Sequence, residues 1–215
     1  KPVMIYPEKQ SIKIGPNDHY EVIYRMVDAG KMVNFVADRP IKGIQIFGAS
    51  GTKKKLLGTT DSSGKVSVEL DKNEWSSIRF SAEHTEGDVI SGELENNYSY
   101  HQLNATPIKL ALYPHSDCYF HFRLIEKGSS GKPILNTTIV NKETGQVWRT
   151  NREGIATAVL SKDLLLSLKK QLSDSVSFTI KSHEFESWTK TYPINVRNYN
   201  KDATPQNVKL KKVYK

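Results

Sequence analysis

The sequence of 215 residues contains one cysteine, Cys118. A lone cysteine excludes an intramolecular disulfide and any metal site built from cysteines alone. Long hydrophobic runs are also missing. No stretch approaches the roughly 18 apolar residues that cross a bilayer, so we expect no membrane span. No apolar signal-peptide segment occurs at the start, which is compatible with a signal removed before Lys1.

The sequence is equally poor in motifs that carry catalysis. It has no Cys-x-x-Cys pair, no Gly-x-Ser-x-Gly elbow and no glycine-rich phosphate loop. Its histidines lack the HxH or HxxxH spacing of a zinc site; they are His19, His84, His101, His115, His121 and His183. We therefore expect no enzyme activity, no cofactor and no metal. Cys118 follows Asp117 at the start of an expected strand, which favours a buried structural thiol over a nucleophile.

The basic surplus is confined to one half of the chain. The formal net charge is +8 and the isoelectric point is about 9.4. Residues 117–215 hold 17 Lys and Arg against 9 Asp and Glu, whereas residues 1–116 hold 14 of each. A basic chain raises nucleic acid as a partner. Here the basic residues are dispersed among acidic ones, so we expect a protein partner at the second half and no nucleic acid.

A period-two alternation of apolar residues dominates what is present. Val66, Val68 and Leu70 alternate with polar residues, and similar patterns occur around residues 44–46 and 208–210. Together with turn sequences at 61–64 and 128–131, this predicts half-buried strands of antiparallel sheets. Residues 161–172 are different, because Ser161 can cap a helix and leucines follow at helical spacing. We predict one short helix there, with no counterpart in the first half.

An internal repeat organises the chain. Residues 39–46 parallel 132–139, 60–66 parallel 150–156, 78–80 parallel 176–178, and 105–107 parallel 203–205, at offsets of 90 to 98. His84 and His183 follow the third of these matches. The repeat predicts an all-β fold of two tandem β-sandwich domains, with the short helix inserted in the second; their Greek-key topology is implied by the family resemblance described next. The predicted limits are 20–115 and 116–215, joined near Pro114, with residues 1–19 as an N-terminal strand segment or the remnant of a preceding domain.

The repeat unit resembles the carboxypeptidase regulatory-like domain, one of the transthyretin-like (prealbumin-type) β-sandwiches. The resemblance rests on Pro40 followed by Thr60-Asp61-Ser62-Ser63-Gly64, and on Pro133 followed by Thr150-Asn151-Arg152-Glu153-Gly154. It covers most of residues 20–215 but involves few positions. It implies a seven-stranded sandwich without an active site, in a secreted, periplasmic or cell-surface protein. Asn151 replaces the usual Asp, and Asn also tolerates tight turns, so we interpret these residues as structural.

Two features of the second repeat suggest a binding surface. The strand after its turn places Ile155, Thr157 and Val159 on the face that should be solvated, which indicates an interface unless the helix at 161–172 covers it. Trp148 precedes Arg149, while Trp188, Lys190 and Tyr192 share one face of a strand. Such aromatic residues could stack on sugars, or could pack between strands. The candidate interface or ligand residues are Trp148, Arg149, Ile155, Val159, Trp188, Lys190 and Tyr192.

Two modifications stay open. Sandwiches of this class can carry a Lys–Asn isopeptide bond, for which Lys31 with Asn104, or Lys127 with Asn207, are the candidates; neither pair lies in a convincing motif. N-glycosylation sequons begin at residues 97, 104 and 136, and would matter in a eukaryotic secreted protein.

Together these observations predict a non-catalytic structural or protein-interaction module of a secreted or cell-envelope protein, acting as a spacer or docking domain. A short linker between sandwiches further predicts a rigid rod. The alternatives are a carbohydrate-binding module that uses the aromatic residues of the second domain, and a regulatory appendage of a fused hydrolase.

Overall fold

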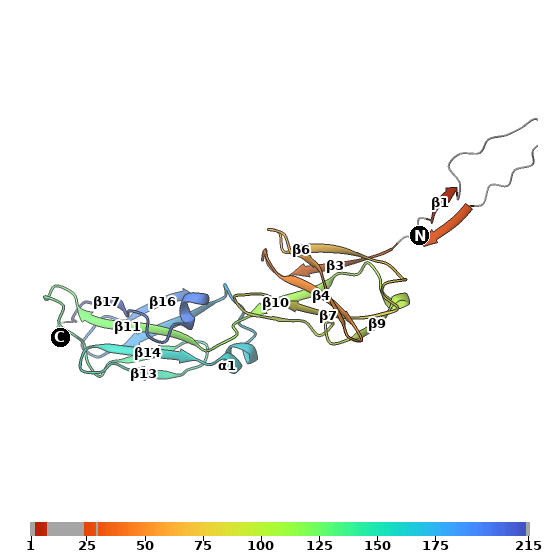
Figure 1. Ribbon diagram of the computed structural model, residues 1–215. Helices are drawn as coiled ribbons and strands as arrows, with labels where there is room; N and C mark the ends of the chain where they lie inside the picture. The colour runs from red at the N-terminus through yellow and green to blue at the C-terminus, as the bar shows by residue number, and fades with distance from the viewer. Residues whose placement is uncertain (1–2, 8–23, 29, 214–215) are drawn as a thin grey trace, which may run out of the picture. The chain divides into compact units, whose positions relative to one another are not determined.

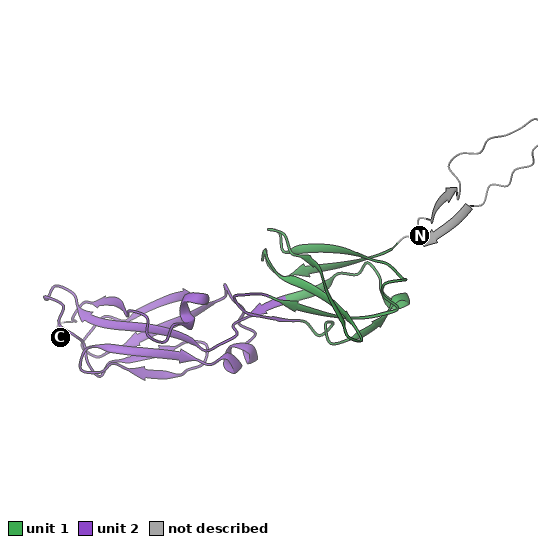
Figure 2. Cartoon of the chain, in the orientation of Figure 1, with its two compact units in different colours: residues 1–83, 91–110 green, residues 84–90, 111–215 purple. Residues whose placement is uncertain are grey.

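The computed structural model describes residues 3–7, 24–28 and 30–213, with side chains from Gly30 onward. The chain divides into two compact units, which Figure 2 distinguishes by colour. The first unit comprises residues 1–83 and 91–110, and the second comprises 84–90 and 111–215. Strand β1 (Val3–Pro7) pairs antiparallel with β2 (Tyr24–Asp28), so the N-terminal segment does supply a strand outside the repeat. Residues 8–19 of the predicted N-terminal segment lie outside the described residues.

The first repeat forms two sheets (Figure 1). One has the order β6 (Lys65–Leu70), β3 (Lys31–Ala37), β10 (Ile108–Tyr113) and β8 (Asp88–Ile90). The other has the order β5 (Lys53–Thr59), β4 (Gln45–Ser50), β7 (Ser77–Glu83) and β9 (Asn97–Ser99), followed by the 3-10 helix η1 (Tyr100–Gln102). Strand β8 and the last residues of β10 are counted with the second unit.

The second repeat has the same plan. A three-stranded sheet has the order β14 (Ile155–Leu160), β11 (Cys118–Glu126) and β17 (Gln206–Leu210). The opposing sheet has the order β13 (Val147–Arg149), β12 (Thr138–Asn141), β15 (Ser175–Lys181) and β16 (Trp188–Pro193). The helix α1 (Lys162–Ser167) follows β14, and the 3-10 helix η2 (Val196–Tyr199) follows β16. The predicted all-β fold of tandem sandwiches is confirmed.

The first and last strands of each repeat are neighbours. In the first repeat β3 pairs parallel with β10 and antiparallel with β6. In the second repeat β11 pairs parallel with β17 and antiparallel with β14. The two halves that share sequence patterns therefore also share strand order and direction.

The turn before β6 and the turn before β14 are built by the same hydrogen bonds. The Asp61 carboxylate accepts the backbone N–H groups two and four residues on, and the Asn151 amide oxygen does the same. Gly64 and Gly154 have φ of 77° and 74°, and in both cases a Cβ atom would lie 2.5 Å from a backbone oxygen. These residues are structural, as predicted, and Asn151 substitutes for Asp without changing the turn.

Each sandwich has its own core, filled by alternate residues of its strands. In β3 the pattern buries Val33, Phe35 and Ala37, and in β14 it buries Ala156, Ala158 and Leu160. The side chains that are at most 1% exposed include Phe35, Ile46, Trp75, Ile78 and Phe80 in the first unit and Phe122, Ile139, Phe178 and Ile180 in the second. The inward and outward positions predicted for the strand after each turn are therefore correct.

The helix prediction holds at its start and fails at its end. The Ser161 hydroxyl accepts the N–H of Leu164 as an N-cap, as expected. The helix ends at Ser167 instead of residue 172, because Lys169 adopts a left-handed φ of 53°. Leu172 is buried outside the helix, where its N–H donates to the carbonyl of Leu112. Across the described part of the chain, α1 is the single α-helix, which agrees with the prediction for the first half.

Candidate functional site

The two tryptophans that were candidates for either ligand binding or packing between strands flank one row of core residues. Across the four-stranded sheet, Trp148 pairs with Ile139, Ile139 with Ile180, and Ile180 with Trp188. Both isoleucines are fully buried, so the row faces the interior. The indole of Trp148 meets Phe178 at a centroid distance of 6.2 Å. The two half-buried indoles thus cover opposite edges of the core and do not share one exposed platform.

Tyr192 and Lys190 belong to the same inward series on β16. Tyr192 is 9% exposed and packs against Phe120, Phe122 and Phe178. Lys190 is exposed because β16 is an edge strand, and its ammonium lies 5.1 Å from the centroid of the Tyr192 ring. An inward-pointing charge on an edge strand also discourages pairing with another chain.

The remaining predicted residues lie on two different outer faces. Arg149 is exposed on β13, and its guanidinium lies 3.5 Å from the side-chain oxygen of Asn136. Ile155 and Val159 are half-buried on the outer face of β14. Their strand partners on β11 are Arg123 and Tyr119. The candidates therefore do not converge on one site, and the proposed helix cover of this face stays a prediction.

His121, to which the sequence assigned no role, lies in the middle of the outer face of β11 and β14. His121 Nδ1 lies 2.9 Å from the hydroxyl of Thr157, and Nε2 lies 3.0 Å from the carbonyl oxygen of Asn200. A carbonyl can only accept, so Nε2 carries the proton and Nδ1 accepts from Thr157. His121 thereby links β14 to the loop before β17.

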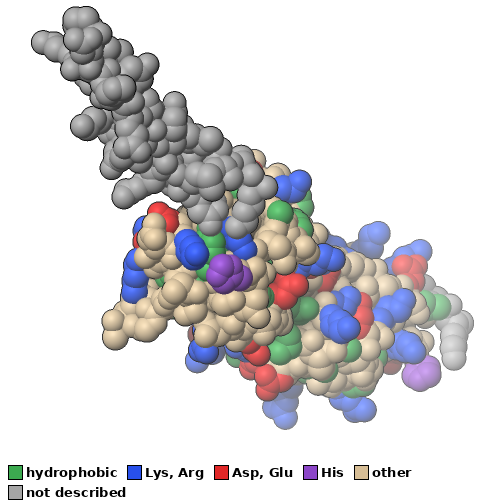
Figure 3. Space-filling model, turned by 90° about the vertical axis from the view of Figure 1, so that its right-hand side faces the viewer, with side chains coloured by type: hydrophobic (Ala, Val, Ile, Leu, Met, Phe, Trp, Pro, Cys, Tyr) green, Lys and Arg blue, Asp and Glu red, His purple; other side chains and the backbone are tan. Residues whose placement is uncertain are grey.

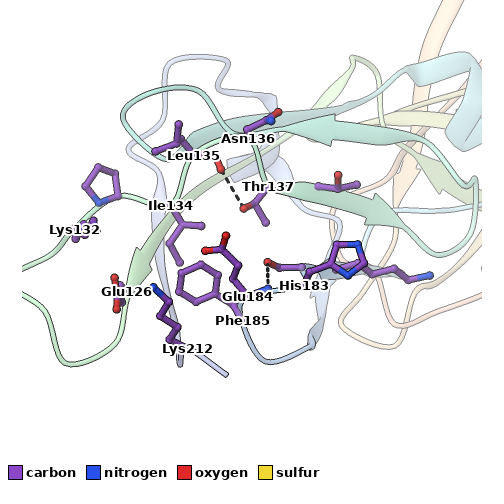
Figure 4. A pocket seen from close by; sticks show the side chains of 14 residues that line it. Glu126, Lys132, Ile134, Leu135, Asn136, Thr137, His183, Glu184, Phe185 and Lys212 are labelled. Carbon is purple, nitrogen blue, oxygen red and sulfur yellow. Dashed lines mark hydrogen bonds between the residues drawn. The ribbon is translucent and has the colours of Figure 1, made fainter. Parts of the chain in front are cut away.

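A cleft of about 760 Å³ lies beside the first residues of β12, and Figure 4 shows its lining. One wall is the segment 134–138 and the other is the segment 182–185. Buried Ile134 and Phe185 line it from within, and Glu184 reaches toward the opposite wall. The remaining ionisable side chains of its lining are Glu126, Lys132, Lys181, His183 and Lys212.

Two of the hydroxyl groups that line this cleft are hydrogen-bonded to the backbone. Thr137 Oγ1 donates to the carbonyl of Leu135 at 3.3 Å, and Ser182 Oγ accepts the N–H of Glu184 at 3.2 Å. No hydroxyl here is hydrogen-bonded to a histidine, in the part of the chain that the structure describes. A hydroxyl–histidine pair of the kind that activates a nucleophile is therefore not seen among the described residues of this cleft. Sequence reasoning missed it because its walls are loops that meet only in the folded chain.

Cys118 is completely buried, as predicted. Burial, with a smaller effect from Asp117, raises the pKa of its thiol to about 12, which removes it as a nucleophile near neutral pH. Among residues 3–7, 24–28 and 30–213, no group of three or more His, Cys, Asp or Glu could hold a metal ion. Within the same residues, no helix is long and apolar enough to cross a membrane.

Charges on the surface are mixed. Figure 3 shows Lys and Arg side chains scattered among Asp and Glu over the face that it draws. On β5, Lys53 and Lys55 both contact Glu74 at 2.8 Å, and Lys54 contacts Glu83 at 2.9 Å. All three lysines of the run at residues 53–55 are thus paired with two carboxylates of their own unit, which does not favour a polyanion site there.

The candidate isopeptide lysine of the first unit is held by backbone groups. Lys31 Nζ donates to the carbonyls of His101 and Leu103, both at 2.9 Å, and lies over the Tyr100 ring. The Asn104 side chain accepts the N–H of Thr106 and donates to the carbonyl of Gln102. Each of the two side chains therefore has hydrogen bonds of its own.

No family description matches the chain, and neither does any curated protein. The solved structures similar to it include the Bacillus anthracis TIE protein, at 10% identity and a TM-score of 0.36 over 90% of this chain. They also include a streptococcal ancillary pilin, at 10% identity and a TM-score of 0.33 over 100% of this chain and 77% of the pilin. The shaft pilin SpaA from Lactobacillus rhamnosus GG has 7% identity and a TM-score of 0.33, over 85% of this chain and 97% of SpaA.

The chain spans 38% of the length of the first of these proteins. Similarities this distant assign no family. The likeness to carboxypeptidase regulatory-like domains stays a resemblance.

Proposed function

We propose that this chain is a non-catalytic spacer module of a secreted or cell-envelope protein, built to resist tension along the chain. The observation that carries this proposal is the parallel pairing of the first and last strands in each repeat. A force applied through the two ends of such a domain pulls these strands in opposite directions along their own axes. The hydrogen bonds between them then bear the load together instead of breaking one after another.

The length of the parallel ladder differs between the repeats. β10 pairs with β3 over three residues, Ile108–Leu110, whereas β17 pairs with β11 over five residues, Gln206–Leu210. Because the load is shared by all bonds of the ladder, the second repeat should withstand the larger force. Forced unfolding is governed by the unfolding rate, so the first repeat should yield first.

The residues that recur in both repeats support a structural role. Buried Thr60 donates to the carbonyl of Ile41 and accepts the N–H of Ile44. Thr150 makes the equivalent pair of bonds in the second repeat. The threonines that recur in the two halves therefore serve to hold the fold together, as expected for a repeated structural unit. The cellular location is proposed from the family resemblance.

Single-molecule force spectroscopy tests the proposal. Pulling through the chain ends should give two unfolding events, the weaker from the first repeat. The matched control applies the force at two introduced cysteines, Lys127→Cys and Lys211→Cys. These positions directly follow β11 and β17, at the same end of the parallel ladder, where the Lys127 N–H donates to the carbonyl of Leu210. This geometry breaks the hydrogen bonds of the same ladder one after another, so the unfolding force of the second repeat should be several-fold lower than when the chain ends are pulled. Equal forces in the two geometries would refute the load-bearing role.

The spacer component has its own test in solution. Small-angle scattering from the intact chain should fit a single fixed separation between the two units, and a broad distribution of separations would contradict it.

A further inference from the structure

A second, smaller pocket of about 290 Å³ opens at the side of the second sandwich. It lies between β11 and the segment that runs from β16 through η2 to β17. The buried rings of Phe120, Phe122 and Tyr192 are part of its lining. Asn195, Arg197 and Gln206 contribute polar groups from the loop side. Its size, near the lower limit for small-molecule sites, suits one ring rather than an extended chain.

The Tyr192 hydroxyl in this pocket lacks a partner. Tyr192 is 9% exposed, and its contacts within the described residues are with aromatic rings and the Lys190 ammonium. No hydrogen bond of its hydroxyl occurs there, and burial raises the pKa of Tyr192 to about 12. The hydroxyl is not among the fully buried polar atoms, so it reaches solvent and is available to a ligand.

The first repeat provides an internal comparison. Tyr98 pairs with Ile78 as Tyr192 pairs with Val176, and each tyrosine packs on the phenylalanine two residues further along that strand. The Tyr98 hydroxyl, however, donates to the carbonyl of Glu93 at 2.9 Å and accepts from Asn96 at 3.3 Å. The tyrosine hydroxyl is hydrogen-bonded by the protein in the first repeat, whereas in the second repeat it has no partner among the described residues and its side chain lines a pocket.

The charge around the pocket has one sign. Among the described residues that line it, none is Asp or Glu. Arg197 is exposed, and its guanidinium makes no ion pair within the described residues. Its backbone is fixed, because its N–H donates to the Asn195 side chain and η2 carries a capping box. Arg197 is thus a cation on a fixed stretch of backbone, with its side-chain donors available.

We propose that this pocket binds a single sugar ring that carries a carboxylate, as in a uronic acid. The apolar face of the ring would pack against the aromatic lining, which suits the amphipathic surface of a sugar. The Tyr192 hydroxyl would hydrogen-bond a ring hydroxyl, and Arg197 would pair with the carboxylate through two parallel N–H groups. The site is separate from the half-buried tryptophans, and it is independent of the load-bearing role.

Titration of the isotope-labelled chain with methyl glucuronide, followed by amide NMR shifts, tests the proposal. Saturable shifts should appear at β11, η2 and the segment before β17. Tyr192→Phe should weaken binding about 3- to 10-fold, since one neutral hydrogen bond is lost, and Arg197→Gln at least about tenfold. Tyr98→Phe, the matched change in the first repeat, should leave binding unchanged. Absence of saturable shifts, or equal affinity in Tyr192→Phe, would overturn the proposal.

Two further probes separate a sugar site from a bare anion site. Methyl glucoside has the same ring without the carboxylate and should bind more weakly than the glucuronide but at the same residues. Acetate supplies the carboxylate alone and should bind only near Arg197, if at all. Acetate binding as tight as the glucuronide would show that the ring is not recognised, which also overturns the proposal.

Discussion

Individual side chains in this protein act mainly by completing backbone hydrogen bonding where strands begin and turn. Thr60 and Thr150 are polar yet 2% and 5% exposed, because each hydroxyl donates to one backbone carbonyl and accepts from one backbone N–H. Threonine is the natural choice, since it offers both functions on a β-branched side chain that suits extended backbone. The Thr-Asp/Asn-x-x-Gly motif therefore joins local bonds of its Asp or Asn to longer-range bonds of its threonine, which reach the preceding strand segment.

Replacing one of these threonines by valine tests this role. Thr60→Val keeps the shape but leaves the carbonyl of Ile41 and the N–H of Ile44 without this partner, and Thr150→Val acts equally in the second repeat. Each variant should lose about 1–3 kcal/mol of unfolding free energy. Urea denaturation of the intact chain measures it. Thr52→Val at an exposed turn position is the control, and losses as small as in that control would contradict the assigned role.

The residue scale was also where the sequence was most informative. Asp61 and Asn151 could be interpreted correctly because their side-chain bonds reach only a few residues along the chain. Tyr192 was a candidate ligand residue from the sequence, but the hydrogen bonding of its hydroxyl could not be predicted. Whether its hydroxyl finds an acceptor depends on a loop that returns from β16, and no local pattern encodes that geometry.

Elements are joined by contacts that sequence patterns locate only in part. The turn between β6 and β7 carries Glu74, which receives Lys53 and Lys55 from β5. Alternation predicts that these lysines point to the same side of a strand, but it does not say which carboxylate meets them. The pairing fixes a connecting turn to an edge strand.

This ion-pair cluster should be visible in a pH titration. Hydrogen bonds from Lys53 and then Lys55 lower the pKa of Glu74 from 4.5 to about 2. A carboxyl with a lowered folded-state pKa contributes stability above its ordinary pKa, and this contribution is lost as pH falls from about 4.5 toward 2. Carbonyl-detected NMR should follow the titration directly. In the Lys53→Gln, Lys55→Gln double variant the pKa should return toward 4.5; a pKa that stays near 2 would exclude the lysines as its cause.

The helix shows why element boundaries were harder to predict than their existence. Leucines recur at helical spacing up to Leu172, yet α1 ends at Ser167. Leu172 is buried, and its N–H donates to the carbonyl of Leu112 on β10. Its helical spacing in the sequence therefore reflects a long-range contact instead of a further turn of helix. The start at Ser161 was predictable because capping is local. Similarly, Trp148 and Trp188 were recognised as strand residues, but their inward direction depends on the row that they flank.

At the scale of the whole chain, repetition made the fold predictable, because two copies of one pattern reveal which residues the architecture requires. Each repeat has its own core and its own turn glycine, so the two sandwiches should be separable in stability. Gly154 lies in the second unit, and an added Cβ would lie 2.5 Å from a backbone oxygen at a φ of 74°. Gly64 is its counterpart in the first unit.

Labelling of the buried Cys118 thiol can separate the two stabilities. Because Cys118 is fully buried, a thiol reagent should reach it only when the second unit opens. Gly154→Ala should destabilise that unit by more than about 1 kcal/mol and speed up labelling about fivefold or more. Gly64→Ala should lower the stability of the first unit by a similar amount and leave the labelling rate unchanged. If Gly64→Ala accelerates labelling as strongly as Gly154→Ala, the sandwiches unfold as one cooperative body and the chain is not a string of independent modules.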